Sequence, residues 1–313
     1  MRRLAAATLS WAALLGAVQA PDPATRARRR GPELWAGLAR DCTVPAGESA
    51  FDLVVEATSL LGSPDPAWRD DIGYGVVASC VYQKRALSHD QRRVLVDTLL
   101  ANLSRGLGET GTDSVLLRSF SALDLSVLAA LELEDPALDE AGYRKLLDAA
   151  LAYLRDEHDL RGLTPRMGWV HATAHTADLL KFLARDPRFT PADQGRLLEA
   201  AWAKLTLRGT PVFAHREDER LAAAVASVVR RADFDLSAFQ RWLDRFPPLE
   251  AEVWSASTPR LATLEAAQNA RHLLDSLFVA LSLTPAAPTS ATARGPSEAA
   301  RQALMDVLHK IHH

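Results

Sequence analysis

Residues 88–103 read SHDQRRVLVDTLLANL, and this stretch decides the fold class because it combines a helix start with a helical repeat of apolar residues. Ser88 is followed three residues later by Gln91, which is the pattern of a capping box. After the box, apolar residues recur three and four positions apart, so they fall on one face of a helix. These residues are Leu95, Val96, Leu99, Leu100 and Leu103. The stretch therefore predicts an amphipathic helix.

The same kind of pattern recurs along most of the chain. Thr190-Pro191, for example, supplies a helix cap followed by a first-turn proline. Aromatic residues make up only 6% of a chain rich in Leu and Ala, which favours helices over strands. Sustained alternation of apolar and polar residues, the pattern of a half-buried strand, is not found. We expect helices near residues 32–41, 48–61, 66–83, 88–105, 113–131, 138–156, 168–185, 190–208, 216–231, 235–245, 257–281 and 297–312.

The connections between these helices are mostly short, which makes consecutive helices antiparallel neighbours. Residues 63–69, SPDPAWR, resemble the start of a HEAT-type repeat, in which Asp caps the helix and Pro occupies its first position. Helices that begin with polar residues restart near Asp70, Asp113, His171 and Glu217, a spacing typical of two-helix repeats. We predict an all-α fold, a right-handed α-solenoid (α–α superhelix) of antiparallel helix pairs. A closed α/α toroid is the alternative.

The first twenty residues have the pattern of a secretion signal. Met1-Arg2-Arg3 is basic, residues 4–17 are largely apolar, and Val18-Gln19-Ala20 is a small-x-small cleavage site. A retained membrane anchor is the alternative, although the apolar run falls short of the about 20 residues that a membrane span needs. We expect a periplasmic or secreted protein with no membrane span after cleavage.

The domain organisation follows from these patterns. Residues 1–20 are the signal peptide, 21–31 a flexible mature N-terminus, 32–282 a helical-repeat domain, 283–296 a Pro/Ala/Thr-rich linker, and 297–313 a C-terminal helix. Apolar residues recur at helical spacing in the C-terminal helix. We therefore expect this helix to pack against the domain.

Charge and cysteine content narrow the class of protein. Cleavage would remove two of the 36 basic residues and none of the 39 acidic ones, leaving a formal charge of −5. A net-acidic chain argues against nucleic acid as a partner, because that affinity rests on clustered Lys and Arg. Cys42 and Cys80 are the only cysteines, and an exported pair tends to form a disulfide. Two separate buried thiols are the alternative.

The most informative polar stretch is GWVHATAHTADLL at residues 168–180. With about 100° of rotation per residue, His171, His175 and Asp178 fall within about 60° of one another on a helix. Two imidazoles and a carboxylate could ligate Zn or another divalent ion. A metal-free ligand or partner groove and a structural polar network are the alternatives.

A metal-dependent reaction would need more than the polar stripe formed by His171, His175 and Asp178. A zinc protease helix carries Glu directly after its first His, and Ala172 stands at that position here. A general base would therefore have to come from another helix, with Glu217 or Glu219 as candidates by repeat register. The sequence leaves open whether the protein is an enzyme.

Two further helix starts carry charged residues. Asp113 is expected as a helix cap, and Arg118 either binds an anionic ligand or forms a salt bridge with a neighbouring helix. Acidic residues from Glu217 to Glu219 suit the positive end of a helix dipole. The groove candidates are Asp113, Arg118, Trp169, His171, His175, Asp178, Glu217 and Arg220.

Several of these motifs together resemble the bacterial family known as domain of unknown function 2785 (DUF2785). The resemblance spans about residues 60–230 and rests on two long stretches, TDSVLLRSFSAL at 112–123 and GWVHATAHTADLL at 168–180. Shorter matches are Arg69, Tyr74, residues 159–162 and residues 219–222. It implies an all-helical, repeat-like fold with the His-His-Asp stripe as a characteristic feature. It implies no activity.

The leading functional expectation is a helical-repeat protein that binds an unknown protein or small polar ligand in a concave groove. The alternative is a metal-dependent hydrolase with a His-x3-His-x2-Asp site, in which Zn lowers the pKa of a bound water. A third hypothesis is a helical toroid that acts on polysaccharides, in which tryptophans stack on sugars. Its candidate residues are Trp68, Trp169, Trp202 and Trp242.

Overall fold

The structure is a computed structural model that describes residues 22–207, 209, 211–255, 257–283 and 296–312. The predicted signal peptide at 1–20 lies outside the described residues, as does nearly all of the predicted linker at 283–296.

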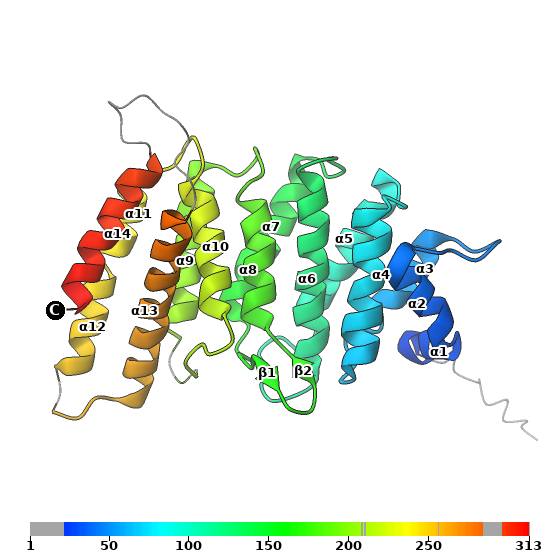
Figure 1. The fold of residues 1–313 in the computed structure, drawn as a ribbon, viewed down its shortest axis with the longest axis horizontal. Helices are drawn as coiled ribbons and strands as arrows, with labels where there is room; N and C mark the ends of the chain where they lie inside the picture. Colours follow the sequence, from blue (N-terminus) through cyan, green and yellow to red (C-terminus); the bar gives the residue numbers. More distant parts are fainter. Residues whose placement is uncertain (1–21, 208, 210, 256, 284–295, 313) are drawn as a thin grey trace, which may run out of the picture.

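The described chain is helical apart from one short hairpin and its connections (Figure 1). The helices are α1 (Pro23–Arg29), α2 (Pro32–Asp41), α3 (Ala50–Thr58), η1 (Ala67–Tyr74), α4 (Gly75–Val77), η2 (Ala78–Gln83), α5 (His89–Leu103), α6 (Ser114–Glu132), α7 (Glu140–Asp156), α8 (Ala172–Leu183), α9 (Pro191–Leu205), α10 (Glu217–Val229), α11 (Leu236–Leu243), α12 (Phe246–Trp254), α13 (Leu261–Ser282) and α14 (Pro296–His312). Strands β1 (Leu163–Thr164) and β2 (Gly168–Trp169) pair antiparallel. The prediction of an all-α protein is confirmed.

The helices lie in two packed rows. In one row η2 packs against α6, α6 against α8, α8 against α10, and α10 against α13. In the other row α7 packs against both α5 and α9, and the rows meet where α5 contacts α6 and α7 contacts α8. Figure 1 shows the helices side by side along the long axis, with α1 and α14 at opposite ends. The middle of the first row, α6, α8 and α10, forms the scaffold of the candidate site.

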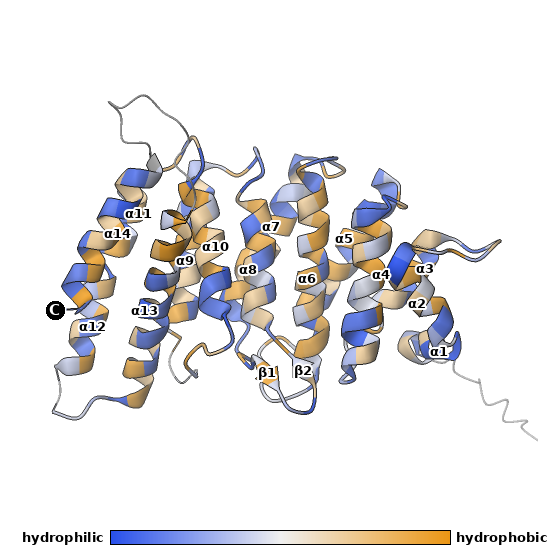
Figure 2. Cartoon of the chain, in the orientation of Figure 1, coloured by the Kyte–Doolittle hydropathy of each residue, from blue (hydrophilic) through white to orange (hydrophobic). Residues whose placement is uncertain are grey.

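Amphipathic helices hold these rows together. Most helices carry both apolar and polar residues along their length (Figure 2), as expected when one face is buried. In α5, the capping box of Ser88 and Gln91 is present, and Leu95 and Leu99 are fully buried whereas Val94 is exposed. Burial of one such leucine side chain stabilises the fold by about 1.5–3 kcal/mol. The periodicity of residues 88–103 therefore predicts both the helix and its buried face correctly.

The prediction of a helix over 168–185 is wrong at its first turn. Gly168 and Trp169 belong to β2, and α8 begins only at Ala172. The backbone N–H of Val170 donates to the carbonyl oxygen of Gly162 at 2.8 Å, so this segment bonds to its hairpin partner. His171 adopts the left-handed conformation with φ of 52°, which a helical turn excludes. Backbone pairing across the hairpin therefore overrides the helical spacing of the side chains.

The N-terminal tail and the region before α13 also differ from the sequence prediction. Part of the expected flexible segment 21–31 forms α1, capped by Asp22. Arg30 then binds carboxylates of Glu48 and Glu56 at 2.7 Å each, so these residues fold onto α3. Helix α12 was missed because its two leading prolines suggest a turn, although prolines fit the first turn of a helix.

One helix after the predicted signal has the length and composition of a membrane span, although no such span was expected. Among the described residues, α6 alone is long and apolar enough to cross a bilayer. However, 78% of its most apolar window is buried inside the protein. Its apolar character therefore matches its position in the middle of the first row.

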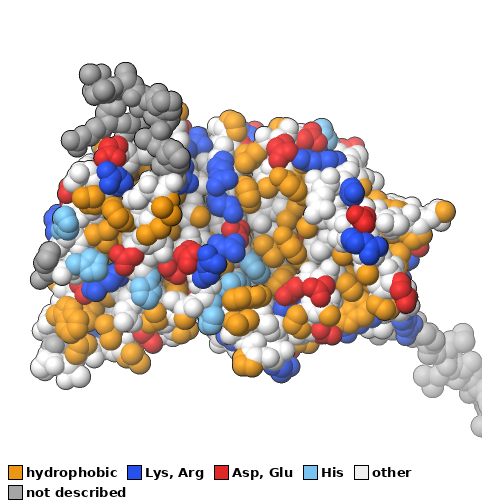
Figure 3. All heavy atoms as spheres, in the orientation of Figure 1, with side chains coloured by type: hydrophobic (Ala, Val, Ile, Leu, Met, Phe, Trp, Pro, Cys, Tyr) orange, Lys and Arg blue, Asp and Glu red, His pale blue; other side chains and the backbone are white. Residues whose placement is uncertain are grey.

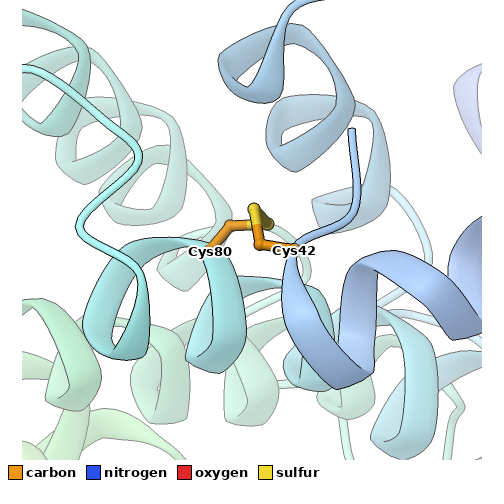
Figure 4. The surroundings of a disulfide bond; sticks show 2 residues. All are labelled: Cys42 and Cys80. Atoms are coloured by element: carbon orange, nitrogen blue, oxygen red, sulfur yellow. A yellow bond between two sulfur atoms is a disulfide. The ribbon is translucent and has the colours of Figure 1, made fainter. Parts of the chain in front are cut away.

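Cys42 and Cys80 form a disulfide (Figure 4). Cys42 directly follows α2 and Cys80 lies in η2, and 38 positions separate them in the sequence. The bond therefore ties the N-terminal helices to the helix that forms one wall of the candidate site.

Candidate ligand-binding groove

A groove of about 680 Å³ crosses the middle of the first row. Its walls come from the helix at 67–83, from α6, from β2 and α8, and from the start of α10. Figure 3 shows Lys, Arg and His side chains gathered in the middle of this face, over α8 and α10. The lining residues are Tyr74, Ala78, Tyr82, Gln83, Leu123, Ser126, Val127, Ala130, Trp169, His171, His175, Asp178, Lys181, Phe182, His215, Arg216 and Arg220.

The wall formed by residues 67–83 has an unusual helical geometry. Wide π-type turns form η1 and η2 on either side of the short α4. Such turns are rare and frequently occur at functional sites. They bring Tyr74, Ala78 and Tyr82, each four residues apart, to the same wall of the groove. The hydroxyl group of Tyr82 donates to Glu134 at 2.9 Å, which fixes one end of this wall.

His171 stands at the turn where the hairpin enters α8. Its ring stacks on Trp169 with centroids 4.3 Å apart, and its Nε2 lies 2.8 Å from the carbonyl oxygen of His215. Arg216, at the corresponding start of α10, also has a positive φ, of 70°. Non-glycine residues rarely adopt this conformation, and it clusters at functional sites. Two of the four described non-glycine residues with positive φ thus line the groove.

His175 forms part of the groove floor. Its Nδ1 lies 2.9 Å from Oγ of Ser119, and its ring meets Phe120 edge-on with centroids 4.9 Å apart. Burial, with a smaller effect of the neighbouring His171, lowers the pKa of His175 to about 3. His175 is therefore neutral near pH 7.

Asp178 binds two cations at once. Lys181, one turn further along α8, lies 2.9 Å from one carboxylate oxygen, and Arg220 of α10 donates to the other. Arg220 remains 47% exposed although its partner Asp178 is 7% exposed. The ion pair therefore joins α8 to α10 while the guanidinium still faces the groove.

The lining carries more positive than negative charge. The lining contains three cations, Lys181, Arg216 and Arg220, and one carboxylate, Asp178, which pairs with Lys181 and Arg220. Arg216 also pairs with Glu219 at 2.7 Å, but Glu219 lies outside the lining. The groove wall is therefore net cationic on a chain whose overall charge is negative.

A buried carboxyl group lies near this site. Asp124 of α6 is fully buried, and neither of its oxygens has a hydrogen-bond partner within the described chain. Burial raises the pKa of Asp124 well above its usual range, which favours the protonated form of this carboxyl group. Burial, with smaller effects of the nearby Asp124 and Asp178, raises the pKa of Tyr74, so its phenol stays neutral near pH 7.

Five of the predicted groove residues come together. Trp169, His171, His175, Asp178 and Arg220 all line the groove. They come from β2, from the start and the body of α8, and from the first turn of α10. The central motif therefore identifies the right place in the fold.

The other three predicted residues lie outside this lining. Glu217 is buried behind His215 and accepts its backbone N–H at 2.8 Å. Arg118 is fully buried and forms a salt bridge with Glu157 at 2.6 Å. Of its two predicted roles, the structure therefore shows the salt bridge. Asp113 occupies the helix-cap position of α6, but its side chain makes no capping bond.

Sequence reasoning missed several polar residues of the groove, among them Lys181, His215, Arg216 and Tyr82. Lys181 follows Asp178 by one turn and could have been found from that spacing. His215 and Arg216 lie in the connection before α10, where helical periodicity carries no information. Tyr82 reaches the groove through the π-type turns, which shift side-chain positions from the α-helical pattern.

The arrangement bears on the predicted metal ligands. In this structure Nε2 of His171 bonds to a carbonyl oxygen, and both oxygens of Asp178 bind cations. Within the described chain no group of three or more His, Cys, Asp or Glu side chains is placed to hold a metal ion. The Zn site at His171, His175 and Asp178 stays a prediction that metal analysis can test.

The tryptophans proposed to stack on sugars do not gather at one site. Trp169 lines the groove, whereas Trp202 packs edge-on against Phe246 with centroids 5.1 Å apart. Trp242 is buried against the same phenylalanine, and Trp68 packs beneath Arg28. These three tryptophans act as packing residues.

Comparison with known proteins places the chain in a family. The family described as "Protein of unknown function (DUF2785)" matches residues 103–279, more than half of the 313-residue chain. The match contains α6, α8 and α10, which provide most of the groove. No curated protein and no solved structure matches the chain. The resemblance noted in the sequence is confirmed, and the chain belongs to the DUF2785 family of proteins of unknown function.

Proposed function

We propose that the protein binds a small anionic ligand in the groove between the helix at 67–83, α6, α8 and α10. The observation that carries this proposal is the excess of positive charge in the lining, which contains three cations and one carboxylate. A recessed, partly apolar site strengthens such charge-assisted contacts relative to open water. The same cations disfavour a divalent metal ion at this place.

The remaining lining suits a compact organic acid. Leu123, Val127 and Ala130 of α6 supply an apolar wall, and Trp169 adds a partly exposed aromatic ring. Small-molecule sites typically combine such apolar walls with a few placed polar groups. The volume of about 680 Å³ falls in the usual range for ligand pockets.

The architecture behind the groove is part of the proposal. We infer an open right-handed α-solenoid in which the row of α6, α8 and α10 lines the concave side. The two packed rows and the opposite positions of α1 and α14 in Figure 1 support an open array over a closed toroid. Ligand sites on one face of a row are typical of repeat proteins.

The proposed location is the periplasm or the exterior. The basic and apolar residues of the first twenty positions support export, and the disulfide between Cys42 and Cys80 is a bond found mainly in oxidising compartments. N-terminal sequencing of the protein purified from its cell envelope or medium is expected to begin at Pro21. Recovery of the protein from the cytosol with its N-terminus intact would contradict this location.

Isothermal titration calorimetry with benzoate tests the binding function. Benzoate combines a carboxylate with a flat apolar body, as the lining requires. Arg220→Gln removes one exposed cation of the groove and is expected to weaken benzoate binding about tenfold. The matched control is Arg155→Gln, because Arg155 is similarly exposed and pairs with an acid, Asp156, outside the groove.

The wild type and the control are expected to bind benzoate equally, with an affinity that falls as salt concentration rises. Absence of saturable benzoate binding overturns the proposal. Equal affinity of the wild type and Arg220→Gln also overturns it, because binding would then occur away from these cations.

A further inference from the structure

The hydrogen bonds around Ser119 determine which nitrogen of His175 carries hydrogen. The Ser119 hydroxyl group donates to the backbone carbonyl oxygen of Val170, which has no hydrogen of its own. A hydroxyl group has one hydrogen, so the 2.9 Å contact between Ser119 Oγ and His175 Nδ1 requires the hydrogen of Nδ1. Nε2 of His175 is therefore the nitrogen with a lone pair.

The same reasoning applies to His171. Its Nε2 lies 2.8 Å from the carbonyl oxygen of His215, and a carbonyl oxygen only accepts hydrogen bonds. Glu217 Oε1, 3.7 Å away, favours hydrogen at the same nitrogen. Nδ1 of His171 is therefore the nitrogen with a lone pair.

Both rings remain neutral and face the groove. Burial lowers the pKa of His171, an effect that Glu217 opposes, and the pKa of His175 is about 3. Both residues line the groove, with ring centroids 5.7 Å apart. No hydrogen bond within the described chain uses Nε2 of His175 or Nδ1 of His171. The protein thus leaves two hydrogen-bond acceptors without a partner beside a cationic wall.

We propose that these two lone pairs accept hydrogen bonds from the ligand, so that the ligand is a small carboxylic acid that also carries a hydroxyl or amino group. The carboxylate would meet Arg220 and Lys181, and the O–H or N–H donor would meet the imidazoles. A ligand without a donor leaves the imidazole nitrogens unpaired when it displaces water, which costs affinity. The inference rests on the proposed binding of an anion and specifies its chemical class.

The first measurement needs no ligand. Long-range proton–nitrogen NMR of the full mature chain, labelled with ¹⁵N-histidine, reports which ring nitrogen carries hydrogen. His171→Asn and His175→Asn assign the two signals. We expect hydrogen on Nδ1 of His175 and on Nε2 of His171 at pH 8. The opposite arrangement at His175 overturns the inference.

The second measurement compares 4-hydroxybenzoate with benzoate, which differ by one hydroxyl group. We expect 4-hydroxybenzoate to bind about tenfold more tightly and to shift a lone-pair nitrogen signal of the two histidines. His175→Asn keeps a donor for Ser119 but lacks Nε2, so we expect it to lose part of the preference for 4-hydroxybenzoate over benzoate. Thermal unfolding confirms that this variant is folded.

The outcomes separate the two proposals. Equal affinity for the two acids in the wild type overturns the inference and leaves anion binding intact. Stoichiometric Zn binding that shifts both lone-pair signals also overturns it, because the imidazoles would then be metal ligands. Binding of neither acid overturns the proposed function, while the hydrogen positions measured without ligand still decide whether the two acceptors exist.

Discussion

The buried imidazole of His175 predicts a specific loss of stability in acid. Its pKa is about 3 in the folded protein, against an ordinary value of 6.5 that applies to the unfolded chain. At pH values between these two pKa values, the imidazole is protonated in the unfolded chain but neutral in the folded protein. Unfolding therefore becomes more favourable as pH falls. The contribution of His175 is complete above pH 6.5 and is lost progressively down to pH 3.

The magnitude follows from the two pKa values. Lowering the pH from 7 to 4.5 is expected to reduce the free energy of unfolding by about 2.5 kcal/mol through this residue alone. For a chain of this size, that corresponds to a fall of about 5 °C in Tm. Carboxylates such as Asp193, whose pKa is lowered to about 2, add their own loss in the same direction.

His175→Asn isolates the contribution of the imidazole. Asn can still donate to Ser119 but does not titrate, and all carboxylates remain in both proteins. Urea unfolding at pH 7, 5.5 and 4.5 should therefore show the wild type losing about 2.5 kcal/mol more than the variant over this range. Parallel loss in the two proteins would refute the argument, because it would mean that His175 becomes protonated without unfolding the site.

Two further predictions concern stability. Replacing Cys42 and Cys80 together with Ser is expected to lower the free energy of unfolding by about 4 kcal/mol, which urea unfolding measures. The reason is that the disulfide restricts the unfolded chain by closing a loop between residues 38 positions apart, and the variant loses this restriction. Gly162→Ala would place a methyl group 2.6 Å from Glu217 Oε1 and closer still to His215 Nδ1, which should cost about 1–3 kcal/mol in the same assay, and unchanged stability would show that this loop yields freely.

Helical periodicity predicts the rows of this fold well because burial and spacing agree. The residues Leu95 and Leu99 of α5 are buried where the pattern places them. The same periodicity fails at 168–171, because a hairpin offers the backbone hydrogen bonds that the first helical turn would otherwise make. The spacing of residues predicts the directions of their side chains only if the backbone conformation is known. At a hairpin, that conformation depends on residues elsewhere in the chain.

The candidate site could also be predicted from the sequence only in part. His175 and Asp178 lie on one helix, so their shared direction could be read from the sequence. Their roles could not, because Ser119 comes from α6 and Arg220 comes from α10. A partner that is 42 to 56 residues away decides whether a polar side chain is a free acceptor or half of an ion pair. Motif spacing therefore located the groove and left its chemistry open.

Asp178 decides how strongly this groove could hold an acid. In this structure its carboxylate already binds Lys181 and Arg220. An incoming carboxylate therefore shares cations that are already partly neutralised, and gains less than it would from free ones. The unpartnered imidazole nitrogens have no such internal competitor. On the proposed function, attraction to the cations would bring acids of many kinds to the groove, and the hydrogen-bond donors of the ligand would decide which acid stays.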